Sequence, residues 1–224
     1  MSISLIKKQA LSVLKGQWGL AVSLTLIVFL ISSIIPSIFE GIFSGSFSNW
    51  LMQDTVPPLA SLISTLVSIA LIPLTVSALW FFLALVRMEG PKISDVFSVF
   101  KDSKTYFKLI GASLLIGIFV FLWSLLLLIP GIIKSLSYSQ TYLLLKDHPE
   151  YSILEAITES RKRMNGYKWQ YFLLNLSFIG WAILSIITLG IGFLWLSPYI
   201  STATATFYNE LISYQDRYKE EEPI

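Results

Sequence analysis

The sequence predicts an all-α protein, a polytopic bundle of transmembrane helices with about six spans in three hairpins, each preceded by an amphipathic interfacial helix. Hydrophobic residues make up 54% of the 224 residues, and the mean hydropathy is +0.70. Charged residues account for only 13%, against roughly 25% in soluble domains. Several uncharged runs reach the ~20 residues that a helix needs to cross a bilayer. We therefore expect residues 1–224 to form a single integral membrane domain.

The first three predicted spans are long apolar runs with clear ends. The first covers 18–39 and has no charge before Glu40. The second covers 59–86, which is longer than a bilayer requires, so we expect tilt or a kink at Pro73. The third covers 109–128. Candidate hinges in these spans and at the end of the third are Pro73, Pro130 and Gly131.

The fourth predicted span, 132–145, is short, about 21 Å of helix at ~1.5 Å per residue. Its polar residues would also suit a helix lying on the membrane surface. The fifth and sixth spans cover 169–189 and 193–212. A six-span arrangement puts all but one of the 16 basic residues on the side of the termini, leaving Lys134 near the other side. The positive-inside rule therefore favours six spans over five, with both termini cytoplasmic.

Each pair of spans follows a basic or amphipathic segment. These cytoplasmic segments cover 2–15, 93–104 and 151–165, and the third begins with a capping box at Ser152 and Glu155. The order suggests a threefold repeat, although basic loops and interfacial tryptophans occur in any polytopic protein. We expect the segments to lie on anionic headgroups, or to dock a cytoplasmic partner. The residues expected at headgroups are Lys7, Lys8, Lys15, Arg161, Lys162 and Arg163.

The last three predicted spans carry several polar residues, and we expect these to face the interior of the bundle and not lipid. They could line a cavity for a small or amphipathic ligand, or they could be hydrogen-bonding contacts between packed helices. The spans carry no internal Asp, Glu, Arg or His, which argues against a carboxylate-based pump. The candidate cavity residues are Lys134, Tyr138, Gln140, Tyr142, Asn175, Ser177, Thr202 and Thr206.

The composition excludes several chemistries. The chain has no cysteine and one histidine, His148, which removes disulfides, thiol nucleophiles and any two-histidine metal site. A net charge of +2 gives no reason to expect nucleic acid. No hydrolase, nucleotide-binding or zinc-protease motif is present. We therefore expect no catalytic residue, no cofactor and no metal site.

Short segments along nearly the whole chain match the pattern of a known family. The matching segments are Lys15-Gly16-x-Trp18-Gly19, Leu122-Trp123-Ser124-Leu125, Ile129-Pro130-Gly131-Ile132-Ile133-Lys134, Ser137-Tyr138-Ser139, Asp147-x-Pro149, Ala156-Ile157-x-x-Ser160, Met164-Asn165-Gly166-x-Lys168, Leu176-Ser177-Phe178-x-Gly180-Trp181, Gly190-Ile191-Gly192, Pro198-Tyr199 and Phe207-Tyr208. In these segments the chain resembles the domain of unknown function 975 family of bacterial integral membrane proteins, which is common in Firmicutes. The resemblance implies an integral protein of the bacterial plasma membrane, but no activity.

Three functions are compatible with these features. The first is a non-enzymatic accessory protein or modulator that binds membrane lipid, another membrane protein or a second copy of itself. The alternative is a transporter or exporter of a small or amphipathic solute, through a polar cavity lined by the short fourth span. A membrane enzyme has only isolated hydroxyls and Lys134 in its favour.

Overall fold

The computed structural model of the chain describes residues 2–44 and 56–221, and every regular element in these two ranges is helical. The elements are α1 (Ile3–Leu14), α2 (Trp18–Phe43), α4 (Pro58–Ala70), α5 (Ile72–Val86), the 3-10 helix η1 (Ile93–Phe100), α6 (Ser103–Leu126), α7 (Leu128–Tyr138), α8 (Thr141–Asp147), α9 (Ile153–Arg163), α10 (Lys168–Leu176), α11 (Ile179–Ile187) and α12 (Phe193–Glu221).

Four helical stretches are long and apolar enough to cross a membrane: α2, α4 with α5, α6, and α10 with α11. They correspond to the first, second, third and fifth predicted spans. The fourth and sixth, 132–145 and 193–212, do not meet the same criterion within the part of the chain that the structure describes. The chain is thus an all-helical protein with several membrane-spanning candidates, as predicted.

The helices follow one another in three units with the same plan. Each unit has a lead helix (α1, η1 or α9), an outgoing stretch (α2, α6 or α10–α11) and a return stretch (α4–α5, α7–α8 or α12). Outgoing and return helices lie side by side, since α2 packs on α4, α6 on α7 and α11 on α12. Gly16 and Gly166 join the lead helix to the outgoing helix in the first and third units. Both have a φ of +83°, which residues with a Cβ rarely adopt.

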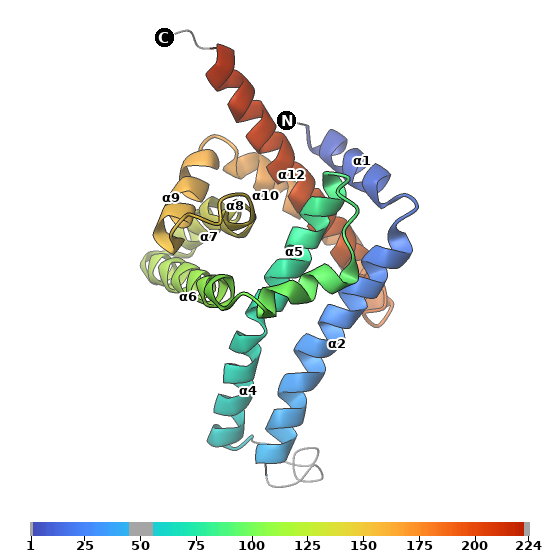
Figure 1. Cartoon of the computed structure of the whole chain (residues 1–224), viewed down its shortest axis with the longest axis vertical. Helices are drawn as coiled ribbons and strands as arrows, with labels where there is room; N and C mark the ends of the chain where they lie inside the picture. The colour runs from blue at the N-terminus through green and yellow to red at the C-terminus, as the bar shows by residue number, and fades with distance from the viewer. Residues whose placement is uncertain (1, 45–55, 222–224) are drawn as a thin grey trace.

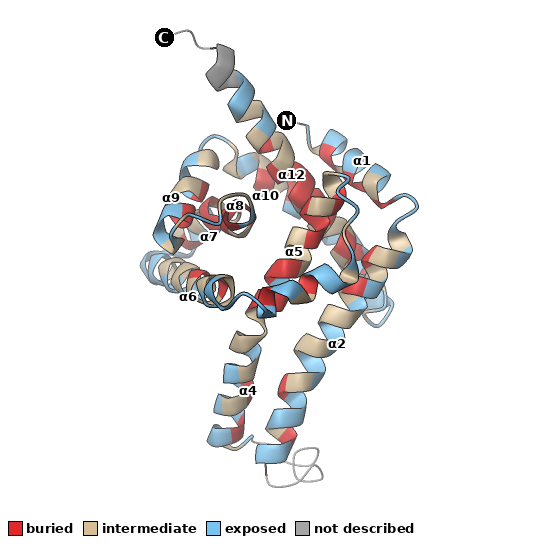
Figure 2. Cartoon of the chain, viewed as in Figure 1, coloured by how far each residue is buried: buried red, intermediate tan, exposed pale blue. Residues whose placement is uncertain are grey.

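The three units are joined in a ring. Each lead helix packs on the return stretch of the unit before it: η1 on α5, α9 on α7 and α8, and α1 on α12. The return stretches meet in the middle, where Phe82 of α5, Leu144 of α8 and Tyr208 of α12 belong to one buried cluster. Figure 2 shows the buried residues gathered around these helices. The core therefore sits where the units meet.

The far ends of the outgoing helices reach away from this core. Figure 1 shows the α2–α4 pair extending downward, α6 seen nearly end-on, and α1 and the C-terminal half of α12 at the opposite end of the molecule. The surfaces that project are apolar, since the exposed fraction is 68% at Leu127 and 95% at Leu189. In water such surfaces would cost free energy in proportion to their area, so they belong in lipid.

Three helix breaks are bridged by side chains of the following unit. At the α4–α5 break, the Tyr106 hydroxyl donates to the Ala70 carbonyl at 2.9 Å. At the α7–α8 break, Ser160 of α9 donates to the Ser137 carbonyl at 2.9 Å and accepts from the Gln140 amide at 3.2 Å. At the α10–α11 break, Lys7 donates to the Ser177 carbonyl at 3.2 Å. Because backbone groups released at a break need partners, these contacts stabilise the bends.

The breaks only partly match the expected hinges. The second predicted span does bend close to Pro73, with the break at Leu71; proline disrupts the helix on its N-terminal side because it lacks an N–H and its ring crowds the preceding turn. Pro130 and Gly131 instead lie inside the first turn of α7, where a proline costs no helical bond. The chain turns earlier, at Leu127. The segment 132–145, expected as one span, is divided between α7 and α8.

Candidate functional site

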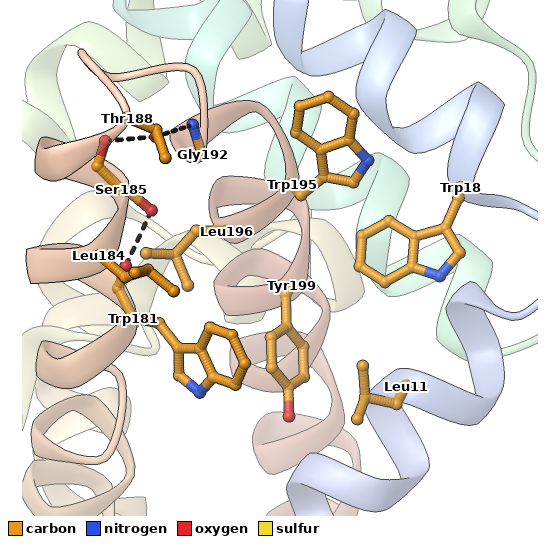
Figure 3. Close-up of a pocket in the computed structure, with 10 residues that line it drawn as sticks. All are labelled: Leu11, Trp18, Trp181, Leu184, Ser185, Thr188, Gly192, Trp195, Leu196 and Tyr199. Carbon is orange, nitrogen blue, oxygen red and sulfur yellow. Dashed lines mark hydrogen bonds between the residues drawn. The ribbon is translucent and has the colours of Figure 1, made fainter.

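A cleft lined by aromatic side chains lies between α1, the start of α2, α11 and the start of α12. Its volume is about 410 Å³. Trp18, Trp181, Trp195 and Tyr199 supply most of its aromatic surface, and Leu11 of α1 closes one side. Figure 3 shows these side chains around the open space between the helices. The cleft is of the size and apolar character typical of small-ligand sites.

The turn between α11 and α12 holds two walls of the cleft at a fixed spacing. The Thr188 hydroxyl donates to the Ser185 carbonyl at 2.8 Å and accepts from the Gly192 amide at 3.0 Å. Leu189 and Gly190 both have positive φ, at 54° and 88°. A Cβ on Gly192 would lie 2.8 Å from the Ser185 Cα, so only glycine allows this close approach.

One end of the cleft meets a positive charge. Lys7 Nζ lies 4.5 Å from the Phe178 ring centroid and 5.9 Å from that of Tyr199, which lines the cleft. Burial lowers the pKa of the Lys7 ammonium, and its bonds to the Ser177 carbonyl and hydroxyl replace lost water. The site thus combines an apolar aromatic interior with a cation beside it. Such a site suits an amphipathic ligand, which has an apolar part and a polar or charged part.

A second apolar pocket of about 700 Å³ lies between α2, α5 and α12. Leu24, Phe29 and Phe82 form much of its wall, and a few hydroxyls add polar points. The Ser32 hydroxyl there is buried and has no hydrogen-bond partner in the described structure. This pocket adds further apolar surface next to α12.

Half of the predicted cavity residues form hydrogen bonds to neighbouring protein groups. Thr202 and Thr206 are buried on α12 and donate to carbonyls of their own helix. The Asn175 side chain donates to the Tyr171 carbonyl, and the Tyr142 hydroxyl to Ser113. These bonds occupy the polar groups that a cavity would present.

The remaining predicted cavity residues lie in different surroundings. Gln140 is fully buried, and its Oε1 has no hydrogen-bond partner among the described residues. Ser177 binds Lys7. Lys134 and Tyr138 line a separate pocket together with Arg161 of α9. Sequence analysis put Lys134 and Arg161 at opposite ends of the spans, whereas in the structure both line the same pocket.

The six cations expected at headgroups are also divided. Lys8 and Lys15 are exposed on α1, as a headgroup contact requires. Glu159 pairs with Lys162 at 3.6 Å and with Arg163 at 3.1 Å. These pairs are on the same helix at the spacing that stabilises helices modestly.

An ionic network that the sequence did not reveal joins the C-terminal ends of α5 and α8 to the middle of α12. Arg87 donates two hydrogen bonds of 2.7 Å to the Asp147 carboxylate and one of 3.2 Å to the side-chain oxygen Oδ1 of Asn209. The Tyr208 hydroxyl donates to the same carboxylate at 2.8 Å. Burial acts to raise the pKa of Asp147, but the bonds from Arg87 and Tyr208 outweigh it and hold that pKa below its ordinary value.

The tryptophans of the cleft were also missed as a set, because they come from positions far apart in the chain. The available signal was the recurrence of tryptophan near the ends of apolar runs, as at Trp18 and Trp195, which by itself predicts only an interfacial position.

Comparison with known proteins places the chain in a family. No curated protein and no solved structure matches it. The model of a family described as a protein of unknown function, DUF975, matches residues 1–135 and 125–215. The two matches together cover nearly the whole chain, so this protein belongs to the DUF975 family.

Proposed function

We propose that this protein is a non-enzymatic accessory protein of the bacterial plasma membrane that binds membrane lipid in the aromatic cleft. The cleft itself carries the proposal: three tryptophans and a tyrosine line about 410 Å³ of apolar space, and Lys7 lies beside it. A lipid has the matching chemistry, with hydrocarbon for the interior and a charged group for the rim.

The proposal includes a topology. The three units would be three membrane hairpins, with both termini in the cytoplasm and the lead helices at the headgroups of the inner leaflet. The basic residues of α1 and α9 support this orientation, and so does the repeated packing of lead helix on return stretch. In this arrangement the cleft opens between lead helix and hairpin, at the depth where tryptophan is favoured.

The non-enzymatic part rests on how the ionisable groups are used. Asp147 is held by Arg87 and Tyr208, and Glu159 by Arg163. The lining of the cleft brings no carboxylate, histidine or lysine to a hydroxyl. A general base within hydrogen-bond reach of a nucleophile is what such chemistry requires.

The transporter alternative depends on a polar path along the fourth predicted span. Gln140, Thr202 and Thr206 are buried in packed contacts, which supports a structural use for them. We therefore propose lipid binding rather than transport.

Photo-crosslinking tests the proposal. The protein is reconstituted in nanodiscs with a phospholipid carrying a diazirine on its acyl chain, irradiated, and digested for mass spectrometry. We expect crosslinks to peptides containing Trp181, Trp195 and Leu11, and a loss of most of that labelling in Trp195→Ala. Trp169→Ala is the matched control, because Trp169 is an exposed tryptophan outside the cleft. Equal labelling of the cleft peptides in both variants would reject the cleft as the lipid site.

A further inference from the structure

A third pocket, between α9 and the α6–α7 pair, is lined by basic side chains as well as apolar ones. Its volume is about 360 Å³, and its wall includes Trp123 of α6, Lys134 and Tyr138 of α7, and Ile157 and Arg161 of α9. Lys134 Nζ lies 4.2 Å from the centroid of the Trp123 ring, a distance at which the aromatic face attracts the ammonium. Two cations therefore line one small pocket.

No described acidic residue pairs with these cations. No acidic residue lines the pocket. The carboxylates of α9 bind elsewhere, Glu159 to Lys162 and Arg163 and Glu155 to the Ser152 amide. Within the described ranges, neither Lys134 nor Arg161 forms a salt bridge. Because two like charges sharing a pocket repel, an anion between them is favoured.

The return helices show that the basic pocket and the aromatic cleft occupy equivalent places. A Cβ on Gly131 would lie 3.0 Å from the Ser124 Cβ, and one on Gly192 would lie 2.9 Å from the Ser185 Cβ. Each glycine follows its serine by seven positions and packs the return helix against the outgoing one. Gly131 and Gly192 can therefore be used to align the two return helices.

The alignment gives each cation a counterpart. Lys134 lies three positions after Gly131 in the basic pocket, and Trp195 lies three positions after Gly192 in the aromatic cleft. A tyrosine lies seven positions after the glycine in both. On the lead helices, Arg161 and Leu11 each precede the joining glycine by five positions. The same place in the fold thus carries two cations in the second unit's pocket and two apolar residues in the third unit's cleft.

Apolar surface continues directly from the basic pocket. The residues that follow Trp123 at the turn of the hairpin are highly exposed, with exposed fractions of 67% at Leu125, 68% at Leu127 and 70% at Ile129. A ligand that fills the pocket with its anionic group therefore has hydrocarbon-binding surface beside it. Arginine and lysine together are well suited to a phosphate group, which accepts several charge-assisted hydrogen bonds.

We propose that the pocket between Lys134 and Arg161 binds the headgroup phosphate of an anionic phospholipid, whose acyl chains lie along the apolar α6–α7 tip. The inference deepens the proposed function and rests on it, since it gives the lipid-binding protein a second site that selects lipid by charge. It also places Lys134 at the same membrane surface as α9. Zwitterionic lipid would bind less well there, because its own cation would approach Lys134 and Arg161.

Lipid retention measures this selectivity. The full-length protein is reconstituted in vesicles of phosphatidylcholine with and without phosphatidylglycerol, extracted in mild detergent and analysed by native mass spectrometry. We expect one phosphatidylglycerol to be retained preferentially. Lys134→Gln and Arg161→Gln should each weaken its retention about tenfold, the effect of losing one charge-assisted contact. Lys134→Arg should retain it. Lys162→Gln, which removes an exposed cation of the same helix, should leave retention unchanged.

The remaining outcomes either overturn the inference or distinguish it from the proposed function of the cleft. Equal retention by Lys162→Gln and Arg161→Gln proteins, both monodisperse, would show that the pocket is not the site. Displacement of the lipid by millimolar inorganic phosphate would show a site for a soluble anion. If Lys134→Gln and Arg161→Gln lose the selectivity for phosphatidylglycerol while diazirine labelling of the aromatic cleft is unchanged, the pocket and the cleft are two separate sites. Normal charge selectivity without any cleft labelling would reject the proposed function of the cleft but keep an anionic-lipid site at Lys134.

Discussion

Replacing Asp147 by asparagine removes the anion that connects the three return stretches. The carboxylate accepts two hydrogen bonds of 2.7 Å from Arg87 and one of 2.8 Å from Tyr208. Asparagine keeps the volume and one acceptor oxygen, but it directs an NH2 group toward the guanidinium or the hydroxyl. The ends of α5 and α8 and the middle of α12 then lose their shared partner.

The size of the effect follows from the number of bonds and their exposure. A hydrogen bond to a charged group contributes about 1.5–3 kcal/mol when it is buried. The Arg87 and Asp147 side chains remain 27% and 18% exposed, and solvent weakens the charge interaction. We therefore expect Asp147→Asn to lower the free energy of unfolding by about 2 kcal/mol, which is a fall of about 5 °C in melting temperature for a chain of this size.

The assay is thermal unfolding in mild detergent, followed over a range of pH. Because the pKa of Asp147 is lowered in the folded protein, its stabilisation is fully present above the unfolded value of about 3.9 and is lost as the pH falls through the folded pKa. The difference between wild type and Asp147→Asn should thus be constant from neutral pH to about pH 5 and should shrink in stronger acid.

The control is Glu150→Gln, which removes a carboxylate that is 64% exposed in the same turn. We expect it to change the melting temperature by less than about 2 °C, since exposed pairs contribute little. If Asp147→Asn were no less stable than Glu150→Gln at neutral pH, the network would not be holding the return stretches together, and the reasoning would be wrong.

Three further predictions concern the breaks, the turns and the depth of the hairpins. Ser160→Ala should destabilise the protein by about 1–2 kcal/mol because it leaves the Ser137 carbonyl unpaired at the α7–α8 break, whereas Ser135→Ala, at an exposed hydroxyl, should be nearly neutral in the same thermal assay. Gly192→Ala should destabilise by about 1–3 kcal/mol through its clash with Ser185, while Gly180→Ala, with open space around it, should not; equal melting temperatures would contradict the close approach. A cysteine in place of Leu127 should resist membrane-impermeant maleimide added to intact cells, because the apolar tip stays in lipid; labelling as fast as in detergent would place the tip in water.

The helical class and the long apolar stretches were predictable because both depend on local composition. The first apolar run begins at Trp18, where α2 begins, and the Ser152 capping box does start α9. Helix caps and apolar runs are set by residues within one or two turns of each other, so one sequence carries the signal.

The candidate site was less predictable because it depends on contacts between distant residues. Hydropathy placed Lys134 by its distance from the end of a predicted span. Its actual surroundings include Arg161 of α9, a helix that comes later in the chain. The polar residues of the fourth predicted span suggested a cavity, but Ser160 of α9 accepts from the Gln140 backbone N–H and Ser113 of α6 accepts from the Tyr142 hydroxyl. Polarity within a helix reveals a need for partners and does not reveal whether those partners are solute, water or protein.

The ring of packed units has a consequence for how the chain is made. The contact between α1 and α12 closes the ring, and Lys7 of α1 donates a hydrogen bond to the Ser177 carbonyl at the α10–α11 break. α1 therefore leaves the ribosome long before the helix that supplies most of its packing surface. Until α12 is synthesised, Ile6 and Ala10 of α1 lack the part of their buried cluster that α12 contributes. The membrane surface is the natural place for the apolar face of α1 during that interval, and the ring closes only when α12 has been made.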